Sequence, residues 1–311
     1  MSISVIIPVF NGAKTIKETI DSILNQIFQN LELIIIDDGS KDTTLEVVKS
    51  FSDSRIKVFS YPNAGLSASR NRGISQAKGE YISFIDADDL WTPDKLESQW
   101  KALQKNPQAA IAYSWTDYID ESSKFIKSGR RIKVNGDAFS KLLLINFLEN
   151  GSNPLIRQEA FEKIGGFDES LLAAEDIDMW LRLAANYEFV CVEKPQILYR
   201  VSTSSMSTNL KRQETASLKV MERAFSYPKA DKFKDLRKES LSHLYQYLTF
   251  KAIEVPPQKR QTLTALYFLW NCIKNNPGVI KNQKLMIIAG LKIFFPQLSQ
   301  RVSQMKKAGA T

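Results

Sequence analysis

The stretch "ISVIIPVFNGAKTIKETIDSIL", residues 3–24, changes the spacing of its apolar residues halfway along. Its first part, residues 3–9, is short and almost wholly apolar, which is typical of a buried β-strand. From residue 14 to residue 29 the apolar side chains recur at helical spacing and fall on one face: Ile16, Ile20, Ile23, Leu24 and Ile27. This stretch therefore predicts a strand followed directly by a helix.

The same alternation continues through the first third of the chain. Further short apolar runs lie at 31–36, 56–60, 81–85 and 109–114. Segments suited to helices lie at 41–51, 66–77 and 93–104, and Pro93 suits the first turn of the last one. Strands that alternate with helices predict an α/β fold, with a mostly parallel, Rossmann-like sheet flanked by helices.

The pattern changes after residue 114. "DYIDESSKFIKSGRR", residues 117–131, predicts a hairpin and a polar loop, and short strand-like and helical pieces then alternate to about residue 201. Beyond residue 206 the pattern predicts helices only, at about 211–226, 231–253, 258–274 and 283–306. We therefore expect two domains, an α/β domain at 1–205 and an α-helical C-terminal region at 206–311.

Charge divides the chain at the same place. Residues 1–205 hold 23 Lys and Arg against 28 Asp and Glu, whereas residues 206–311 hold 19 against 6. A basic tail favours an anionic partner, either a membrane surface or an acidic protein. No nucleic-acid-binding motif accompanies the charge, so we expect no nucleic-acid partner. The alternative is that the tail helices pack on the first domain or on a second copy, as in a homodimer, with their lysines solvated.

Several classes of site and location are disfavoured by composition. Cys191 and Cys272 form no metal-binding spacing and indicate free thiols in a reducing cytosol. The single histidine, His243, lies in the basic tail, so zinc or histidine-based catalysis is not expected. The first residues resemble a strand rather than a signal peptide, and the apolar run at 285–296 is too short to span a bilayer. We expect a cytoplasmic protein.

Polar residues follow three of the predicted strands. Asn11 comes after the first strand, Asp37-Asp38-Gly39-Ser40 after the second, and Asp86-Ala87-Asp88 after the fourth. Ligands of open parallel sheets bind outside the carboxyl ends of the strands, where these residues would meet. Two carboxylates one residue apart can share Mg²⁺ or Mn²⁺ with substrate phosphates. A D-x-D alone is also an ordinary turn, but two acidic clusters at neighbouring strand ends favour a metal-assisted nucleotide site. The chain has no P-loop motif, and no GxGxxG follows the first strand.

These motifs in this order resemble a known enzyme family. "ISVIIPVFNGAKTIKETIDSIL" (3–24), "LELIIIDDGSKDTT" (31–44), "NAGLSASRNRGISQAKGEYISFIDADD" (63–89) and "AAEDIDMWLRL" (173–183) look like the family-2 inverting glycosyltransferases with the GT-A fold. The resemblance covers residues 1 to about 205 and leaves out the tail.

The resemblance implies roles for particular residues. The residues that would bind the nucleotide sugar are Pro8, Phe10, Asn11, Asp38, Arg70, Asp86, Ala87 and Asp88. Within this set Asp38 would accept a hydrogen bond from the base, and Asp86 and Asp88 would face the metal. A Tyr-Arg-x-His segment is often present in the family, but this chain has Tyr199-Arg200-Val201-Ser202. Either water fills the position of the histidine, or Arg200 and the hydroxyls of Ser204 and Ser205 contact the diphosphate.

The general base of the family corresponds to Asp176. An acid at a helix start is also an ordinary N-cap, so both interpretations of Asp176 stay open. Glu175, Trp180 and Trp91 are candidates for the acceptor side. We expect Trp180 to belong to the core and Trp91 to be the better candidate for contact with a sugar.

The sequence as a whole predicts a metal-dependent, inverting glycosyltransferase. It would move one sugar from a nucleoside-diphosphate sugar, with UDP-sugars favoured, to a hydroxyl such as that of a lipid-linked glycan, in cell-surface polysaccharide or glycolipid synthesis. The QxxRW segment of processive synthases is absent, which favours transfer of single sugars. The alternatives are a nucleotide-sugar-binding module without turnover and a sugar-phosphate nucleotidyltransferase. The basic tail would place the enzyme on the inner face of the membrane.

Overall fold

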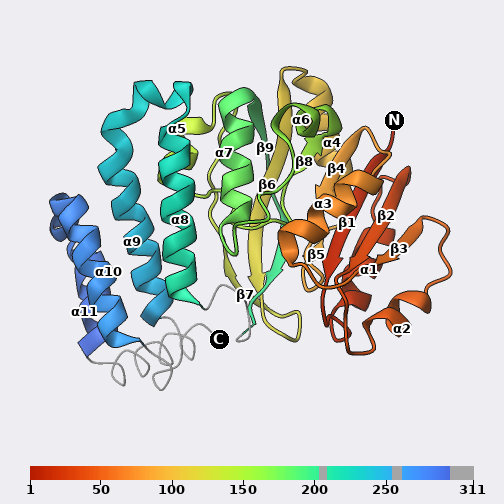
Figure 1. Ribbon diagram of the computed structural model, residues 1–311, viewed down its shortest axis with the longest axis horizontal. Coiled ribbons are helices and arrows are strands. Elements are labelled where there is room, and N and C mark those ends of the chain that lie inside the picture. The colour runs from red at the N-terminus through yellow and green to blue at the C-terminus, as the bar shows by residue number, and fades with distance from the viewer. Residues whose placement is uncertain (203–208, 254–260, 295–311) are drawn as a thin grey trace. The chain divides into compact units, whose positions relative to one another are not determined.

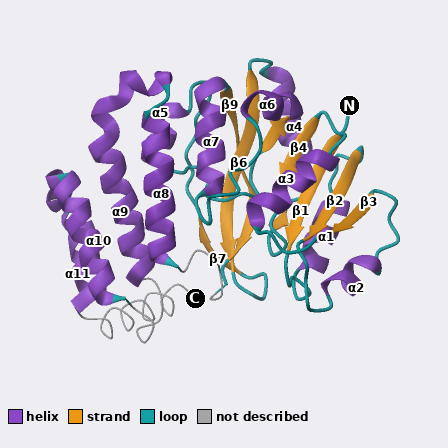
Figure 2. Cartoon of the chain, viewed as in Figure 1, coloured by secondary structure: helices purple, strands orange, loops and turns teal. Residues whose placement is uncertain are grey.

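A computed structural model describes residues 1–202, 209–253 and 261–294 of the chain. The chain forms two compact units (Figures 1 and 2). Unit 1 comprises Met1–Leu142 and Asn146–Ser205, and unit 2 comprises Leu143–Ile145 and Met206–Thr311. The main boundary falls between residues 205 and 206, while a three-residue piece from the first part of the chain joins unit 2.

Unit 1 is built on one nine-stranded sheet with the order β3-β2-β1-β4-β8-β6-β9-β5, and β7 pairs with β6. The strands are β1 Ile3–Val9, β2 Leu31–Asp37, β3 Ile56–Ser60, β4 Tyr81–Phe84, β5 Leu90–Trp91, β6 Ala109–Ile119, β7 Phe125–Ser128, β8 Leu155–Arg157 and β9 Glu188–Arg200. The first four neighbours in this order are parallel, as predicted. Beyond β4 the sheet is mixed, because β8 runs antiparallel to both β4 and β6.

The helices of this part of the chain are α1 Ile16–Leu24, α2 Thr44–Lys49, α3 Leu66–Gln76, α4 Lys95–Lys105, α5 Phe139–Leu144, α6 Gln158–Ile164 and α7 Glu175–Asn186. Side chains of a strand alternate between the two faces of the sheet. In β1, Ile3, Val5 and Ile7 share a buried cluster with the apolar face of α1. The neighbouring residue Ile6 meets α3, where a Cβ added to Gly73 would lie 2.3 Å from Ile6 Cγ2. Helices therefore cover the parallel part of the sheet on both faces, as the alternating pattern predicts.

Unit 2 contains helices only among the residues that the structure describes. They are α8 Leu210–Phe225, η2 Pro228–Leu236 (a 3₁₀ helix), α9 Arg237–Ile253, α10 Thr262–Asn275, η4 Pro277–Lys281 (also 3₁₀) and α11 Gln283–Phe294. Their buried cluster includes Leu248 and Ile253 of α9, Phe268 and Cys272 of α10, and Ile293 of α11. Parts of the predicted helices at 258–274 and 283–306 lie outside the described residues. Within the described ranges, no helix has the length and apolar character needed to cross a bilayer.

Candidate active site

The carboxyl ends of β2, β1 and β4 lie side by side, because these strands are neighbours in the sheet. The loop after β1 is fastened to the loop after β2. The Asn11 N–H donates to Ser40 Oγ at 2.9 Å, and Asn11 Oδ1 accepts from the Lys41 N–H at 2.7 Å. Asn11 adopts a left-handed backbone with φ of 53°, which asparagine tolerates better than most residues. Beside it, Pro8 is buried in β1 and the Phe10 side chain is 52% exposed.

Asp38 holds the loop that leads into α3. Its two carboxylate oxygens accept from the backbone N–H groups of Ala64 at 2.9 Å and Gly65 at 2.8 Å. Arg72 forms an ion pair with the same carboxylate at 3.0 Å and stacks on the ring of Tyr61. The Asp38 side chain is 5% exposed, and its two oxygens accept from three donors of the protein. That Asp38 accepts a hydrogen bond from a base stays a prediction. Its role in holding this loop was not expected, and Arg72, the seventh residue of α3, gave no signal of it.

Arg70 joins two acidic segments that are far apart in the sequence. Its Nη2 donates to Asp86 Oδ1 at 2.8 Å, and its Nη1 donates to Glu175 Oε1 at 3.1 Å. The guanidinium is 1% exposed and lies 5.1 Å from the centroid of the Phe167 ring. Burial lowers the pKa of Arg70, but the nearby carboxylates outweigh it and the net shift is upward. Arg70 therefore fixes the end of β4 against the start of α7.

The three aspartates after β4 have different environments. Burial, helped by repulsion from Asp86, raises the pKa of Asp88 to about 6. Asp89 is fully buried, and its carboxylate accepts from Ser152 Oγ and from the Arg200 N–H. Burial and the two neighbouring aspartates raise the pKa of Asp89 well above its usual value. Asp89 thus anchors the loop, which leaves Asp86 and Asp88 as the half-buried pair.

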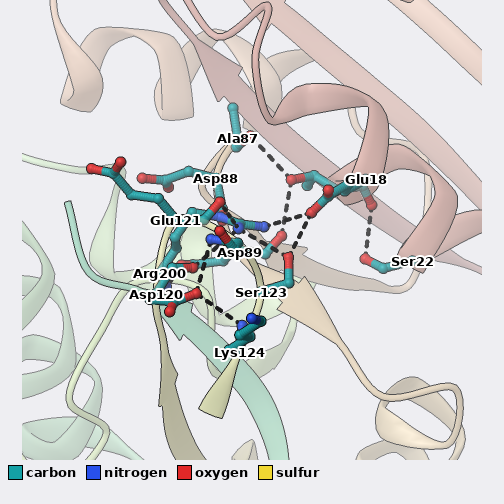
Figure 3. A network of polar contacts seen from close by, with 12 residues as sticks. Glu18, Ser22, Ala87, Asp88, Asp89, Asp120, Glu121, Ser123, Lys124 and Arg200 are labelled. Carbon is teal, nitrogen blue, oxygen red and sulfur yellow. Dashed lines mark hydrogen bonds and ion pairs between the residues drawn. The ribbon is translucent and has the colours of Figure 1, made fainter. Parts of the chain in front are cut away.

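Arg200, at the end of β9, is a centre of polar contacts behind Asp88 (Figure 3). Its Nε donates to the Asp88 carbonyl at 2.7 Å, and its Nη2 donates to Glu18 Oε2 at 2.7 Å. Its Nη1 donates to the carbonyls of Asp120 and Glu121 and to Ser123 Oγ. The side chain is only 3% exposed and each of its nitrogens already donates within the protein. Of the two alternatives for the missing histidine, these contacts disfavour the one in which Arg200 binds the diphosphate. Ser204 and Ser205 lie outside the described residues.

The first turn of α7 supplies the remaining acids. Burial and the adjacent Glu175 raise the pKa of Asp176 to about 7, although Arg70 opposes the shift. A carboxylate that titrates near neutral pH can take up a proton during a reaction at that pH. Asp178, by contrast, is 1% exposed and pairs with Arg182 at 2.9 Å, so it serves the structure of the helix. Ala174, just before the helix, has a left-handed backbone with φ of 57°.

Both tryptophans considered for the acceptor side lie in the core. Trp180 is fully buried, in agreement with its interpretation as a core residue. Trp91 is 3% exposed, its Nε1 donates to the Ser152 carbonyl at 2.8 Å, and Lys95 Nζ lies 3.7 Å from the ring centroid. The expectation that Trp91 contacts a sugar is therefore wrong, since its ring is enclosed by protein. The apolar run before the D-x-D gave no sign that the chain would turn back as β5.

The residues after β4 suit a divalent cation. Asp86 and Asp88 offer hard oxygen ligands, which Mg²⁺ and Mn²⁺ prefer. Burial, and then repulsion from Asp86, raises the pKa of Asp88, and a cation bound there would favour the ionised carboxylate. Across the described ranges, no group of three His, Cys, Asp or Glu side chains converges to hold a metal alone. Two carboxylates therefore fit a metal that is shared with substrate phosphates.

A model of the family "Glycosyltransferase like family 2" matches residues 4–252 of the sequence. The chain belongs to this family. The resemblance inferred from the motifs is confirmed, and the family match extends beyond residue 205 into unit 2.

Relatives of this glycosyltransferase carry consistent names. A protein named an uncharacterized glycosyltransferase, from Rickettsia typhi, is 39% identical over 184 residues, 58% of this chain and 58% of the relative. Another from Methanocaldococcus jannaschii is 30% identical and covers 69% of this chain and 76% of the relative. The chondroitin synthase of Pasteurella multocida is 31% identical over 68% of this chain but only 22% of its own length. The chain thus spans little more than half of the Rickettsia typhi relative, and far less of the synthase.

Solved structures support the fold of the glycosyltransferase. Residues 1–349 of Staphylococcus aureus TarS, in complex with UDP-GlcNAc, match with a TM-score of 0.61 and 18% identity over 91% of this chain and 93% of that one. The mannosyltransferase PcManGT from Pyrobaculum calidifontis, in complex with GDP-Man and Mn²⁺, matches with a TM-score of 0.61 and 19% identity over 95% and 87%. The predicted GT-A architecture with a helical C-terminal part is confirmed.

Proposed function

We propose that this glycosyltransferase is a metal-dependent, inverting enzyme that transfers one sugar from a nucleoside-diphosphate sugar to a hydroxyl acceptor. The observation that carries the proposal is the Arg70 bridge, with contacts of 2.8 Å to Asp86 and 3.1 Å to Glu175. Through this bridge the acidic pair after β4 and the acids that begin α7 belong to one site. A sugar donor held at the acidic pair after β4 would present its sugar to a base at the start of α7.

The donor would be held at the carboxyl ends of β1, β2 and β4. Asp86 and Asp88 would hold a divalent cation, which when bound offsets the charge of the diphosphate. Structures of similar fold contain UDP-GlcNAc in one case and GDP-Man with Mn²⁺ in the other, which supports nucleotide sugars as the donor class. We favour UDP-sugars. Pro8, Phe10, Asn11 and Ala87 would line the nucleotide, and the exposed ring of Phe10 is free to stack on a base.

Asp176 would act as the general base. The acceptor oxygen forms a bond to the anomeric carbon while the bond from that carbon to the diphosphate breaks. The acceptor proton passes to the Asp176 carboxylate, and the nucleoside diphosphate leaves. A single displacement of this kind inverts the anomeric configuration. The pKa of about 7 suits a base that works near neutral pH, and the Ile177 N–H, which donates to Asp176 Oδ1 at 2.7 Å, would hold the group in place.

The acceptor belongs to the chemistry of cell-surface polysaccharides or glycolipids. Relatives named chondroitin synthase and hyaluronan synthase support a glycan acceptor. We expect a cytoplasmic enzyme that contacts the inner membrane face, where lipid-linked glycans would be available.

A donor assay tests the proposal. Nucleotide sugars are first screened with Mn²⁺ by thermal shift, and release of nucleoside diphosphate from the stabilising donor is then measured. Wild-type protein should release it, and Asp176→Asn should do so about 10²–10⁴-fold more slowly with unchanged donor affinity. Binding without turnover would instead identify a binding module, and release of pyrophosphate from a nucleoside triphosphate and a sugar phosphate would identify a nucleotidyltransferase. The anomeric configuration of the product, read by NMR, tests inversion.

A further inference from the structure

The last part of the chain carries charge of one sign. Residues 255–311 contain nine Lys and Arg and no Asp or Glu. A protein surface that only has to be solvated ordinarily mixes both signs, because like charges repel one another. A segment without any acid favours contact with an anionic partner.

α10 carries an apolar stripe on the side opposite its core contacts. Leu263, Tyr267 and Trp270 are 82%, 51% and 65% exposed, and their spacing of four and three residues places them on one helix face. Lys274 follows four residues after Trp270 and continues the same line towards the end of the helix. Unit 2 buries the opposite side of α10, including Ala265, Phe268 and Cys272. The Tyr267 ring also packs on Tyr245 and Phe268, and its hydroxyl donates to Glu214 Oε1 at 3.2 Å. Core packing does not explain the exposure of Leu263 and Trp270, on either side of it.

α11 repeats this arrangement. Ile287, Leu291 and Phe294 are 59%, 39% and 62% exposed at the same spacing, while Ala289 and Ile293 on the other side are buried. Between the two helices, η4 adds Ile280, which is 54% exposed, and Lys281. We refer to these exposed residues of α10, η4 and α11 together as the α10–α11 surface: Leu263, Tyr267, Trp270, Lys274, Ile280, Lys281, Ile287, Leu291 and Phe294.

We propose that the α10–α11 surface binds an anionic lipid bilayer. Its apolar stripes suit shallow insertion among acyl chains, and its lysines suit lipid headgroups. Trp270 is of the residue type that prefers the boundary between headgroups and acyl chains. A second copy of this chain is a poorer occupant, because it would bring Lys274 and Lys281 of one copy towards those of the other. Absence of a spanning helix among the described residues agrees with binding in the plane of the membrane.

The role of this contact rests on the proposed function, although the contact itself does not. A bilayer held by unit 2 would supply the glycosyltransferase with acceptors that carry a lipid. Because vesicle binding needs neither donor nor turnover, it can be measured separately from transfer.

Co-sedimentation of the full chain with vesicles tests the surface. The probes are phosphatidylcholine vesicles and phosphatidylcholine vesicles that also contain phosphatidylglycerol, each at low and high salt. Wild-type protein should sediment with the anionic vesicles at low salt, and less at high salt because salt screens the headgroups. Trp270→Ala should weaken binding roughly tenfold through lost apolar contact. Lys274→Glu with Lys281→Glu should weaken it at least about fivefold for each lysine.

Matched variants in unit 1 serve as controls. Phe125 is 63% exposed, so Phe125→Ala removes a comparable aromatic ring, and Lys49→Glu with Lys105→Glu makes the same change of net charge at exposed positions. Both controls should bind vesicles as the wild type does, and circular dichroism should show every variant folded. Three results would overturn the proposal: wild-type protein that stays in the supernatant with anionic vesicles at low salt, equal losses in test and control variants, or a wild-type dimer that Trp270→Ala dissociates. Vesicle binding without donor turnover would leave this surface standing and would contradict the proposed function instead.

Discussion

Asp88 lies directly after the buried strand β4, half-buried beside Asp86, and burial raises the pKa of its carboxyl to about 6. If it binds a cation, Asp88→Asn should abolish the enhancement of nucleoside-diphosphate binding by Mn²⁺ and leave the fold intact. Calorimetric titrations with and without Mn²⁺ measure this. Asp89→Asn is the matched control, because Asp89 lies next in the chain but is tied to Ser152 and Arg200. It should lower the melting temperature instead. Equal affinities for wild type and Asp88→Asn would remove Asp88 from the site.

Asp176 should give the reaction a characteristic pH dependence. Its carboxylate must be ionised to accept a proton, and its pKa in the free protein is about 7. We therefore expect kcat/KM to rise with pH up to about pH 7 and to level off above it. Initial rates at subsaturating donor across this range test the expectation. A profile that is already flat at pH 5 would mean that a different group takes the proton.

At the scale of elements, Arg200 holds together α1, the loop after β4 and the loop between β6 and β7. Arg200→Lys keeps a positive charge but loses the planar fork that reaches these segments at once. We expect a lower melting temperature together with at least tenfold weaker donor binding, because the backbone of Asp88 loses its support. Donor titration of the folded variant measures the second effect.

Arg182→Lys is the matched control for that substitution. Arg182 also pairs with an acid, Asp178, and donates to two backbone carbonyls, those of Ile164 and Gly166. It should lose stability without loss of donor affinity. If both variants lose donor affinity equally, Arg200 has only a general structural role.

Packing of α3 against β1 leaves no room for a side chain at Gly73. A Cβ there would lie 2.3 Å from Ile6 Cγ2, so Gly73→Ala must displace the helix that carries Arg70. We expect a loss of about 1–3 kcal/mol in the free energy of unfolding, together with lower activity. Gly290→Ala in α11 is the control, because an added Cβ there meets nothing within 4 Å. It should be neutral or stabilise by about 0.5–1 kcal/mol. Urea denaturation of both variants decides.

Some of these elements could be predicted from the sequence, and others could not. Periodicity indicated β1 to β4 and the helices between them, because each is a local pattern that tertiary contacts reinforce. It did not indicate that β8 enters antiparallel beside β4, nor the two-residue strand β5, since such pairings depend on distant segments. Among the candidate site residues, Asp38, Asp86 and Asp88 were predicted from their positions after strands, and Asp176 from the resemblance to the family. The ion pair of Asp38 with Arg72 and that of Arg200 with Glu18 could not be found, because the partners lie 34 and 182 residues apart.

For the whole molecule, the acids of the site should make stability depend on pH. A carboxyl whose pKa is raised by folding binds more protons in the native state, so it lowers stability as pH rises from the unfolded value towards the folded one. For Asp176 this window runs from about 4 to about 7, and above it the loss is complete. Asp176→Asn should therefore gain stability over the wild type, with little gain at pH 4 and on the order of 5 °C at pH 8.

The difference in melting temperature between Asp176→Asn and the wild type reports the titration of Asp176 alone. Lys95 is fully buried, and burial lowers its pKa well below the usual range, so its own effect on stability has the opposite sign. That effect is common to both proteins and cancels in the difference of their melting temperatures. A difference that stays constant from pH 4 to pH 8 would show that folding does not raise the pKa of Asp176.

The hydrogen bonds between the Asp38 carboxylate and the loop before α3 determine which substitutions each partner tolerates. The donors at positions 64 and 65 are backbone N–H groups, which every residue except proline provides. Position 64 should therefore tolerate every amino acid except proline. Position 65 should favour glycine, because its φ of 93° is unfavourable for other residues. Asp38 has no such freedom, because no other side chain of its length offers two charged oxygens. Genetic variation at these positions should thus be tightly restricted at Asp38, which accepts the hydrogen bonds, and permissive at position 64, which donates one of them.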